Sequence, residues 1–210
     1  MSRYLRNTCA NPQARILLLH GAGAPMDSLW MNTVAEALSS LQLDVVRWEF
    51  QYMHQRRVNG KKRPPSKAPV LLAELAETIS ELQTWDQMPL FLAGKSMGGR
   101  MATMLIAQQP ELNIHACLAF GYPFHPPGKP ERLRTEHFSA LKAPVYILQG
   151  SADTMGNQTL VSGLRLPDNM HIRWVESGNH DLRAKGLKQA EVMPTLAAEV
   201  TAFVNVMLGR

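Results

Sequence analysis

The sequence predicts an α/β fold in which a mainly parallel sheet is covered by helices on both faces. Short apolar runs alternate along the chain with segments that keep a helical period, and this alternation is typical of parallel sheets. The runs are apolar at nearly every position, as strands buried on both faces require. About six strands are expected, at residues 15–19, 43–50, 90–93, 114–120, 145–149 and 171–175.

The segments between these strands have the boundary residues and the spacing of helices. Asp27 or Ser28 can cap the first helix, Pro69 can begin the second, and Pro110 stops the third. The last keeps apolar side chains on one face. Helices are therefore expected at residues 28–40, 69–82, 97–109 and 194–208.

The composition is that of one globular domain. Of the 210 residues, 45% are hydrophobic and 19% are charged, which suits a single packed core. We expect one domain over residues 15–210, preceded by an N-terminal extension over residues 1–14. Cys9 and Cys117 are too few for a disulfide framework, and no apolar segment is long enough for a signal peptide or a membrane helix. These features predict a cytoplasmic protein without membrane contact, either a monomer or a homodimer.

The net charge of +5 is concentrated in one part of the chain. The basic segment, residues 54–67, carries six of the 22 Lys and Arg residues and no acidic residue. We expect a solvated loop there, and the alternative is a basic rim that attracts anionic substrates. No aromatic residues are interleaved with these charges, as a stacking platform for nucleic acid requires. No nucleic-acid partner is therefore expected.

The strongest local pattern is Gly-x-Ser-x-Gly at Gly94, Ser96 and Gly98. It follows an expected strand and precedes an expected helix, which is the setting of a nucleophilic serine on a sharp turn. Neighbouring chains pass close to such a turn, so side chains at positions 94 and 98 would collide with them. The turn also places the Met97 amide at a helix N-terminus, where it can donate to an oxyanion. The alternative is that the glycines serve packing alone.

A nucleophilic serine needs a base and an acid that orients the base, and after such a turn the acid precedes the histidine in the chain. Asp153 follows the strand expected at residues 145–149, at the sheet edge where α/β active sites form. His180 lies in a loop directly after the last expected strand. Asp181 is an alternative acid, but its side chain would point away from the neighbouring ring. We therefore prefer Asp153.

A second oxyanion donor is expected in the turn after the first strand. His20-Gly21-Ala22-Gly23-Ala24 is a run of small residues whose backbone amides can face a substrate oxygen. We assign the Ala22 amide first and the Gly23 amide second, and a plain tight turn is the alternative. His20 is expected to be structural, with its ring bonded to the loop backbone.

Five segments, taken in order, resemble the small dienelactone-hydrolase-like branch of the α/β-hydrolases: HGAGAPMDS, GKSMGGRMA, GYPFHPPGKPERLRTEH, PVYILQGSAD and SGNHDL. The resemblance extends from about residue 15 to the C-terminus. It implies a triad of Ser96, Asp153 and His180, and an oxyanion hole formed by the Ala22 and Met97 amides. Dienelactone hydrolase itself has a cysteine nucleophile where this sequence has Ser96, which argues against dienelactone as the substrate.

These residues predict a serine hydrolase that acts on small carboxylic esters or thioesters through an acyl-enzyme intermediate. No cofactor is expected, because the chemistry needs none and the histidines and cysteines lack zinc-ligand spacing. Some relatives in this branch are non-enzymatic parts of larger assemblies. The alternative is therefore a catalytically silent module used for binding or as a scaffold.

The substrate site is expected to be open. Lids are commonly inserted after the strand that ends here at Phe120, but only about 15 residues follow it before the next helical pattern, too few for a cap domain. Tyr122, Phe124 and His125 would lie at the active edge and line the pocket, and packing of this loop on the sheet is the alternative. Lys95 and the basic segment would favour an anionic acyl or alcohol group. The candidates for substrate contact are Gly23, Lys95, Tyr122, Phe124 and His125.

Overall fold

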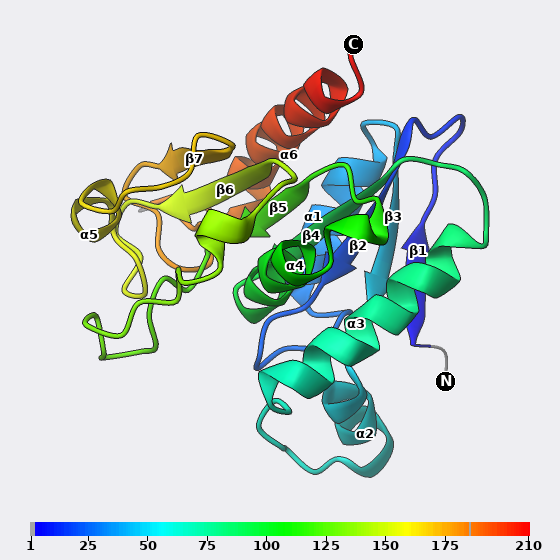
Figure 1. The fold of residues 1–210 in the computed structure, drawn as a ribbon. Helices are drawn as coiled ribbons and strands as arrows, with labels where there is room; N and C mark the ends of the chain where they lie inside the picture. Colours follow the sequence, from blue (N-terminus) through cyan, green and yellow to red (C-terminus); the bar gives the residue numbers. More distant parts are fainter. Residues whose placement is uncertain (1–2, 185) are drawn as a thin grey trace.

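A seven-stranded sheet forms the centre of the computed structural model, which describes residues 3–184 and 186–210 (Figure 1). The strands are β1 (Tyr4–Asn7), β2 (Ala14–Leu19), β3 (Leu43–Trp48), β4 (Leu90–Lys95), β5 (Cys117–Phe120), β6 (Val145–Gly150) and β7 (Met170–Val175). Their order across the sheet is β1-β3-β2-β4-β5-β6-β7, and all neighbours are parallel except β1, which runs antiparallel to β3. The six expected strands are confirmed. The seventh, β1, lies within the expected N-terminal extension.

Helices cover both faces of the sheet. The helices α3 (Ala68–Gln83) and α4 (Met97–Gln108) pack on one face, and α1 (Leu29–Ser39) and α6 (Gln189–Met207) pack on the other (Figure 1). Alternate residues of β2 enter the two layers, because successive side chains of a strand point to opposite faces. Both layers are apolar, which explains why the strands read as continuous apolar runs.

Two short helices were not predicted, and one predicted helix starts earlier than expected. The helix α2 (Gln51–Asn59) contains the first part of the basic segment, so only residues 60–67 of that segment form the expected loop. The helix α5 (Gln158–Ser162) follows β6, and two single turns are η1 (Pro110–Leu112) and η2 (Phe138–Ala140). Helix α6 begins before Pro194, which lies inside it although proline cannot donate the helical hydrogen bond.

The chain reverses its direction of travel across the sheet between β3 and β4. From β2 it moves outward to β3, and it then returns to the other side of β2 to form β4. Open α/β sheets bind ligands at the carboxyl ends of the strands beside such a switch point. Here those ends are Leu19 and Lys95, so the turn at residues 20–24 and Ser96 meet at this edge.

The turn between β4 and α4 has the strained geometry that its glycines predict. Ser96 has φ 51° and ψ −112°, a conformation that costs free energy for any residue with a side chain. A Cβ atom on Gly94 would lie 2.3 Å from the backbone of Gly98, and a Cβ atom on Gly98 would lie 2.6 Å from the Leu19 carbonyl oxygen. The expected collisions at both positions are confirmed.

Buried ion pairs join the first three strands at the opposite edge of the sheet. The Arg15 side chain is only 2% exposed and donates to Asp44 over 2.7 Å. The same carboxylate accepts from Arg6 of β1 over 2.8 Å, so two guanidinium groups hold it. Arg15 also reaches Asp86, whose side chain is 41% exposed. The shared Asp44 carboxylate thus ties β1 to β3 and β2.

Asp44→Ala should destabilise the fold far more than Asp86→Ala, although both remove a partner of Arg15. Breaking a buried pair costs about 3 kcal/mol or more, whereas an exposed partner contributes about 1 kcal/mol or less. Urea unfolding of the two variants and the wild type measures both losses. Equal losses would contradict this assignment of the network's stability to the buried Asp44 carboxylate.

Candidate active site

The structure brings Ser96, His180 and Asp153 into one hydrogen-bonded line. Ser96 stands on the turn after β4, Asp153 follows β6, and His180 lies in the loop after β7. The His180 Nε2 atom lies 2.8 Å from Ser96 Oγ, and its Nδ1 atom lies 2.8 Å from Asp153 Oδ2. Because a carboxylate only accepts, Nδ1 carries the ring proton and Nε2 is left to accept the serine proton.

Asp153 is completely buried and held from several sides. Its Oδ1 atom accepts from the Met155 amide over 2.8 Å, and its Oδ2 atom accepts from Gln149 Nε2 over 2.8 Å as well as from His180. Gln149 is also buried, and the Tyr122 amide donates to its side-chain oxygen. This glutamine was not predicted, because a single amide at a strand end carries no recognisable motif. The alternative acid, Asp181, pairs with Lys95 over 3.2 Å instead of facing the ring.

The loop that carries His180 lies directly on the ends of two strands. A Cβ atom on Gly121, after β5, would lie 2.3 Å from the His180 carbonyl oxygen. A Cβ atom on Gly150, at the end of β6, would lie 2.3 Å from the Gly178 carbonyl oxygen. Glycine at both positions lets the loop come close enough for the imidazole to reach Ser96.

Lys95, a candidate for substrate contact, lines the smaller cleft beside Ser96 and is also bonded to the loop that carries His180. Its buried Nζ atom donates to the His180 carbonyl oxygen over 2.7 Å and pairs with Asp181. Burial lowers the pKa of Lys95, and the Asp181 charge opposes that shift. Nζ also lies over the Trp30 ring, 5.7 Å from its centroid. These contacts place the Lys95 charge where it fixes the backbone of the loop.

The residues whose amides are expected to bind an oxyanion, Ala22 and Met97, lie beside Ser96. Both residues line the same cleft as Ser96. Met97 is the first residue of α4, so its amide has no acceptor within the helix. The Ala22 amide donates to no other described residue. Gly23, the second choice, lines a neighbouring cleft, and its carbonyl oxygen accepts from Arg56 over 3.1 Å.

The turn that carries Ala22 is fixed by residues at the end of β3 and in α2. His20 Nδ1 donates to the Gly21 carbonyl oxygen over 2.6 Å, and the Phe50 amide donates to His20 Nε2 over 3.2 Å. The ring is therefore neutral, and burial lowers the pKa of His20. The Tyr52 hydroxyl donates to the Ala22 carbonyl oxygen over 2.9 Å. The expected structural role of His20 is confirmed, and α2 serves the same turn.

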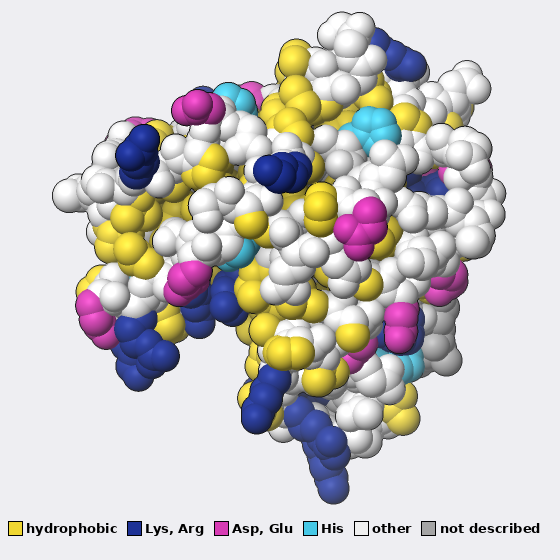
Figure 2. All heavy atoms as spheres, in the orientation of Figure 1, with side chains coloured by type: hydrophobic (Ala, Val, Ile, Leu, Met, Phe, Trp, Pro, Cys, Tyr) yellow, Lys and Arg dark blue, Asp and Glu magenta, His cyan; other side chains and the backbone are white. Residues whose placement is uncertain are grey.

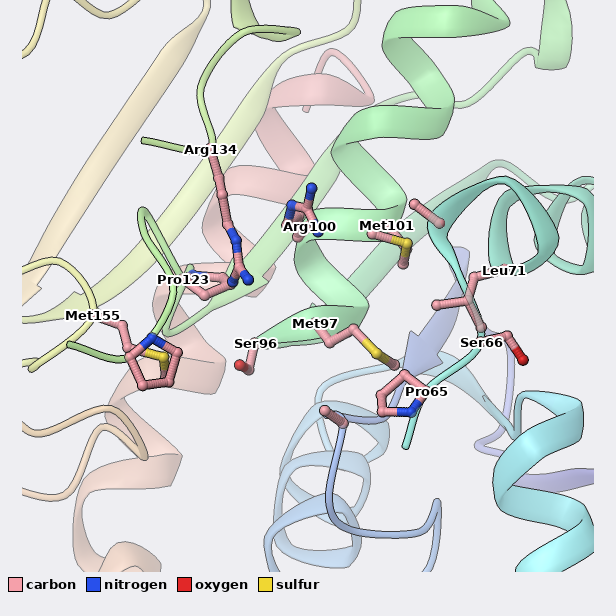
Figure 3. A pocket seen from close by; sticks show the side chains of 13 residues that line it. Pro65, Ser66, Leu71, Ser96, Met97, Arg100, Met101, Pro123, Arg134 and Met155 are labelled. Atoms are coloured by element: carbon pink, nitrogen blue, oxygen red, sulfur yellow. The ribbon is translucent and has the colours of Figure 1, made fainter. Parts of the chain in front are cut away.

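Two clefts meet at Ser96, and Ala22 and Met155 line both of them. The first, shown in Figure 3, has a volume of about 360 Å³ and extends between α3, α4 and the loop after β5. The second has a volume of about 280 Å³ and is lined by Trp30 and Met31 of α1. The two groups attached to a carbonyl carbon that Ser96 attacks could therefore occupy separate clefts.

Tyr122, Phe124 and His125 do not line these clefts, contrary to expectation. Tyr122 and Phe124 are completely buried, their rings pack edge-to-face, and both contact the Phe138 ring. His125 is only 4% exposed. The Tyr122 hydroxyl donates to the Arg134 carbonyl oxygen over 2.8 Å. The loop over residues 121–135 folds its rings into the core because apolar rings gain most from burial. It presents Pro123, Pro127 and Arg134 to the cleft instead.

Over residues 3–184 and 186–210, His, Cys, Asp and Glu form no group of three or more that could hold a metal ion. In the same ranges, no helix is long and apolar enough to cross a lipid bilayer.

Residues 12–205 match the family model of the alpha/beta hydrolase domain. The chain belongs to this family. The solved structures most similar to this hydrolase include a dienelactone hydrolase from Anabaena variabilis, with 18% identity and a TM-score of 0.72 over 95% of this chain and 88% of that chain. Est1E from Butyrivibrio proteoclasticus, in a structure with ferulic acid bound, has 14% identity and a TM-score of 0.71 over 99% of this chain and 95% of that chain. A monoacylglycerol lipase from Paleococcus ferrophilus has 15% identity and a TM-score of 0.65 over 96% and 99%.

The predicted α/β-hydrolase fold and the resemblance to its dienelactone-hydrolase-like branch are confirmed by these matches. The described residues of the hydrolase contain no separate cap domain. At these identities the similar structures establish the fold of the chain.

The pH dependence of the hydrolase's stability should contain a contribution from His20. Its pKa is lowered in the folded state, so the unfolded chain takes up this proton first as the pH falls below about 6.5. The stabilisation is therefore complete above that pH and is lost below it. As the pH falls from 7 to 5, the unfolding free energy of His20→Gln should decrease less steeply than that of the wild type. The two slopes should differ by up to about 1.4 kcal/mol per pH unit. Urea unfolding across this range tests it, and parallel profiles would refute it.

Proposed function

We propose that this α/β-hydrolase is a serine hydrolase that cleaves carboxylic esters or thioesters of small substrates. The observation that carries the proposal is the line of hydrogen bonds from Ser96 through His180 to the buried Asp153. A hydroxyl is a weak nucleophile unless a base takes its proton, and this line supplies the base in the required tautomer. The names of the similar structures, among them a hydrolase and a lipase, agree with this chemistry.

The reaction follows from the positions of these groups. Ser96 Oγ attacks the carbonyl carbon while His180 Nε2 takes its proton, and Asp153 stabilises the imidazolium that forms. The Ala22 and Met97 amides bind the oxyanion, and losing one such donor typically costs about 3 kcal/mol of transition-state stabilisation. His180 then protonates the leaving alcohol or thiol, and water cleaves the acyl-enzyme by the reverse sequence of proton transfers.

The size of the substrate is limited by the two clefts beside Ser96. Their volumes of about 360 and 280 Å³ suit small acyl and alcohol groups. The first is bordered by residues of the loop after β5 and by the first residues of α3, and no cap domain covers it in the described part of the chain. Small esters can therefore enter without a large rearrangement.

Fluorophosphonate labelling tests the central claim. The wild type should be labelled at Ser96, and Ser96→Ala should not be labelled. Asp153→Asn should lower turnover of p-nitrophenyl acetate by about 10⁴-fold, because the wrong tautomer of His180 is then favoured. The matched control is Asp181→Asn, which removes the exposed partner of Lys95 but leaves the bond from Lys95 to the His180 carbonyl oxygen, and it should cost no more than about fivefold. If folded wild type is not labelled, the chain is a silent module of this fold.

Lys95→Met distinguishes a lysine that positions His180 from one that binds substrate. Because Lys95 holds the His180 carbonyl oxygen, the variant should lower kcat for a neutral ester about tenfold or more and leave KM within about twofold. Lys95→Arg, which keeps a donor, should recover part of the loss. A raised KM for anionic esters with an unchanged kcat for neutral ones would assign Lys95 to the substrate instead.

A further inference from the structure

Two half-buried arginines line the larger cleft beside Ser96. Arg100 lies in α4, one helical turn after Ser96, and its amide donates to the Ser96 carbonyl oxygen over 3.0 Å. Arg134 lies at the end of the loop after β5, and its amide donates to the Phe124 carbonyl oxygen over 2.8 Å. Figure 3 shows the Arg134 side chain extending from this loop toward α4 and Ser96.

Neither guanidinium group has a partner among the described residues. No nitrogen of the Arg100 or Arg134 side chain donates a hydrogen bond or forms an ion pair there, and Arg100 Nε is buried without an acceptor. The other arginines of the described ranges that are buried or half-buried all have partners. They are Arg3 with Glu74, Arg15 with Asp44, Arg47 with Asn7 and Asn32, Arg56 with the Gly23 carbonyl oxygen, and Arg57 with Asp27 and Glu49.

The positive charge of the pair is compensated only in part. Burial and the charge of Arg100 lower the pKa of Arg134, so the two groups repel each other. Burial and Arg100 lower the pKa of His137 to about 4, so its ring is neutral at pH 7 and adds no charge. Glu131 and Glu136 line an adjoining hollow together with both arginines, and the Glu136 charge opposes the lowering of the Arg134 pKa. Both glutamates are exposed, however, and neither forms an ion pair with the arginines.

The rest of the cleft is mainly apolar. Leu71, Met97, Met101 and Met155 line it together with prolines. Figure 2 shows the hollow between the loop after β5 and the start of α3, with dark blue side chains on its inner wall. Half-burying two like charges in such surroundings costs free energy unless an anion compensates them. A buried polar atom without a partner in a native structure calls for an explanation, and a bound ion is one such explanation.

We propose that Arg100 and Arg134 form a subsite for an oxyanion, a carboxylate or a phosphate, carried by the ester that Ser96 cleaves. The proposal rests on the proposed function and names its substrate class. Guanidinium groups bind such anions through paired, charge-assisted hydrogen bonds. Since four residues of helix rise about 6 Å, the anion would lie a few bonds from the carbonyl that Ser96 attacks.

The test compares charged and neutral esters of matched size. For an anion on the acyl side, the pair is p-nitrophenyl hemiglutarate and p-nitrophenyl pentanoate. For an anion on the alcohol side, the pair is p-acetoxybenzoate and its methyl ester, and p-acetoxyphenyl phosphate supplies the phosphate arm. The wild type should show a kcat/KM about tenfold or more higher for a charged ester in at least one arm. Equal or better hydrolysis of the neutral ester in every arm would overturn the proposal.

The variants Arg100→Gln and Arg134→Gln locate the preference. Each should lower kcat/KM for the preferred charged ester about 10- to 100-fold and for its neutral counterpart by less than about threefold. Arg132→Gln, an exposed arginine of the same loop, should change neither. An equal loss on both esters would show that the arginines support the fold or the chemistry, and would also overturn the proposal.

A binding measurement separates this proposal from the proposed function. Calorimetry of Ser96→Ala with hemiglutarate methyl ester, p-acetoxybenzoate and inorganic phosphate reports the subsite without any turnover. If Ser96→Ala binds one of these anions and the double variant Ser96→Ala with Arg100→Gln does not, the subsite is supported even if the wild type hydrolyses no ester. If the wild type is labelled at Ser96 and cleaves neutral esters while none of these anions binds, the subsite fails and the serine hydrolase stands.

Discussion

The site depends on close contact between backbone segments at the carboxyl edge of the sheet. Gly94 and Gly98 let the turn before α4 pass against its own helix and against β2, and Gly121 and Gly150 let the loop of His180 rest on the ends of β5 and β6. A single Cβ atom at any of the four would meet backbone at less than 3 Å. Because these contacts are between backbones, they cannot be relieved by a change of rotamer, and they set the distance between the imidazole and the serine.

Arginines at the two edges of the sheet differ in whether they have partners. At the amino edge, Asp44 binds Arg6 and Arg15, and these bonds hold three strands in register. At the carboxyl edge, Asp153 receives hydrogen bonds from Gln149, Met155 and His180, while Arg100 and Arg134 have no partner in the described chain. Among the buried and half-buried arginines of the described chain, these two are the ones whose guanidinium groups have no partner at all, which points to a ligand.

The sequence predicted the parts of this molecule that follow from order and periodicity. Six strands, and the meeting of Ser96, Asp153 and His180, follow from apolar runs and from the chain order of the motif. The strand β1 was missed because a short edge strand paired on one side needs no apolar run. Tyr122 and Phe124 lie at the predicted edge of the sheet, but their side chains point into the core and not into the cleft. In an irregular loop no periodic pattern of apolar residues indicates which way a side chain points. The sequence does not single out Arg100 and Arg134, because whether an arginine has a partner is decided only in the folded chain.

A hydrolase without a cap has little surface with which to select its substrate by shape. Here the clefts are bounded by one loop of about 15 residues, the turn at residues 20–24 and the first residues of α3. A hydrophobic wall discriminates by only about 1–3 kcal/mol per methylene, whereas a site whose buried charges stay unpaired with the wrong substrate can reject it far more strongly. On the proposed assignment, the unpaired arginines therefore give this small site a selectivity that its walls cannot. They do so because the two charges are left without a partner unless an anionic substrate occupies the cleft.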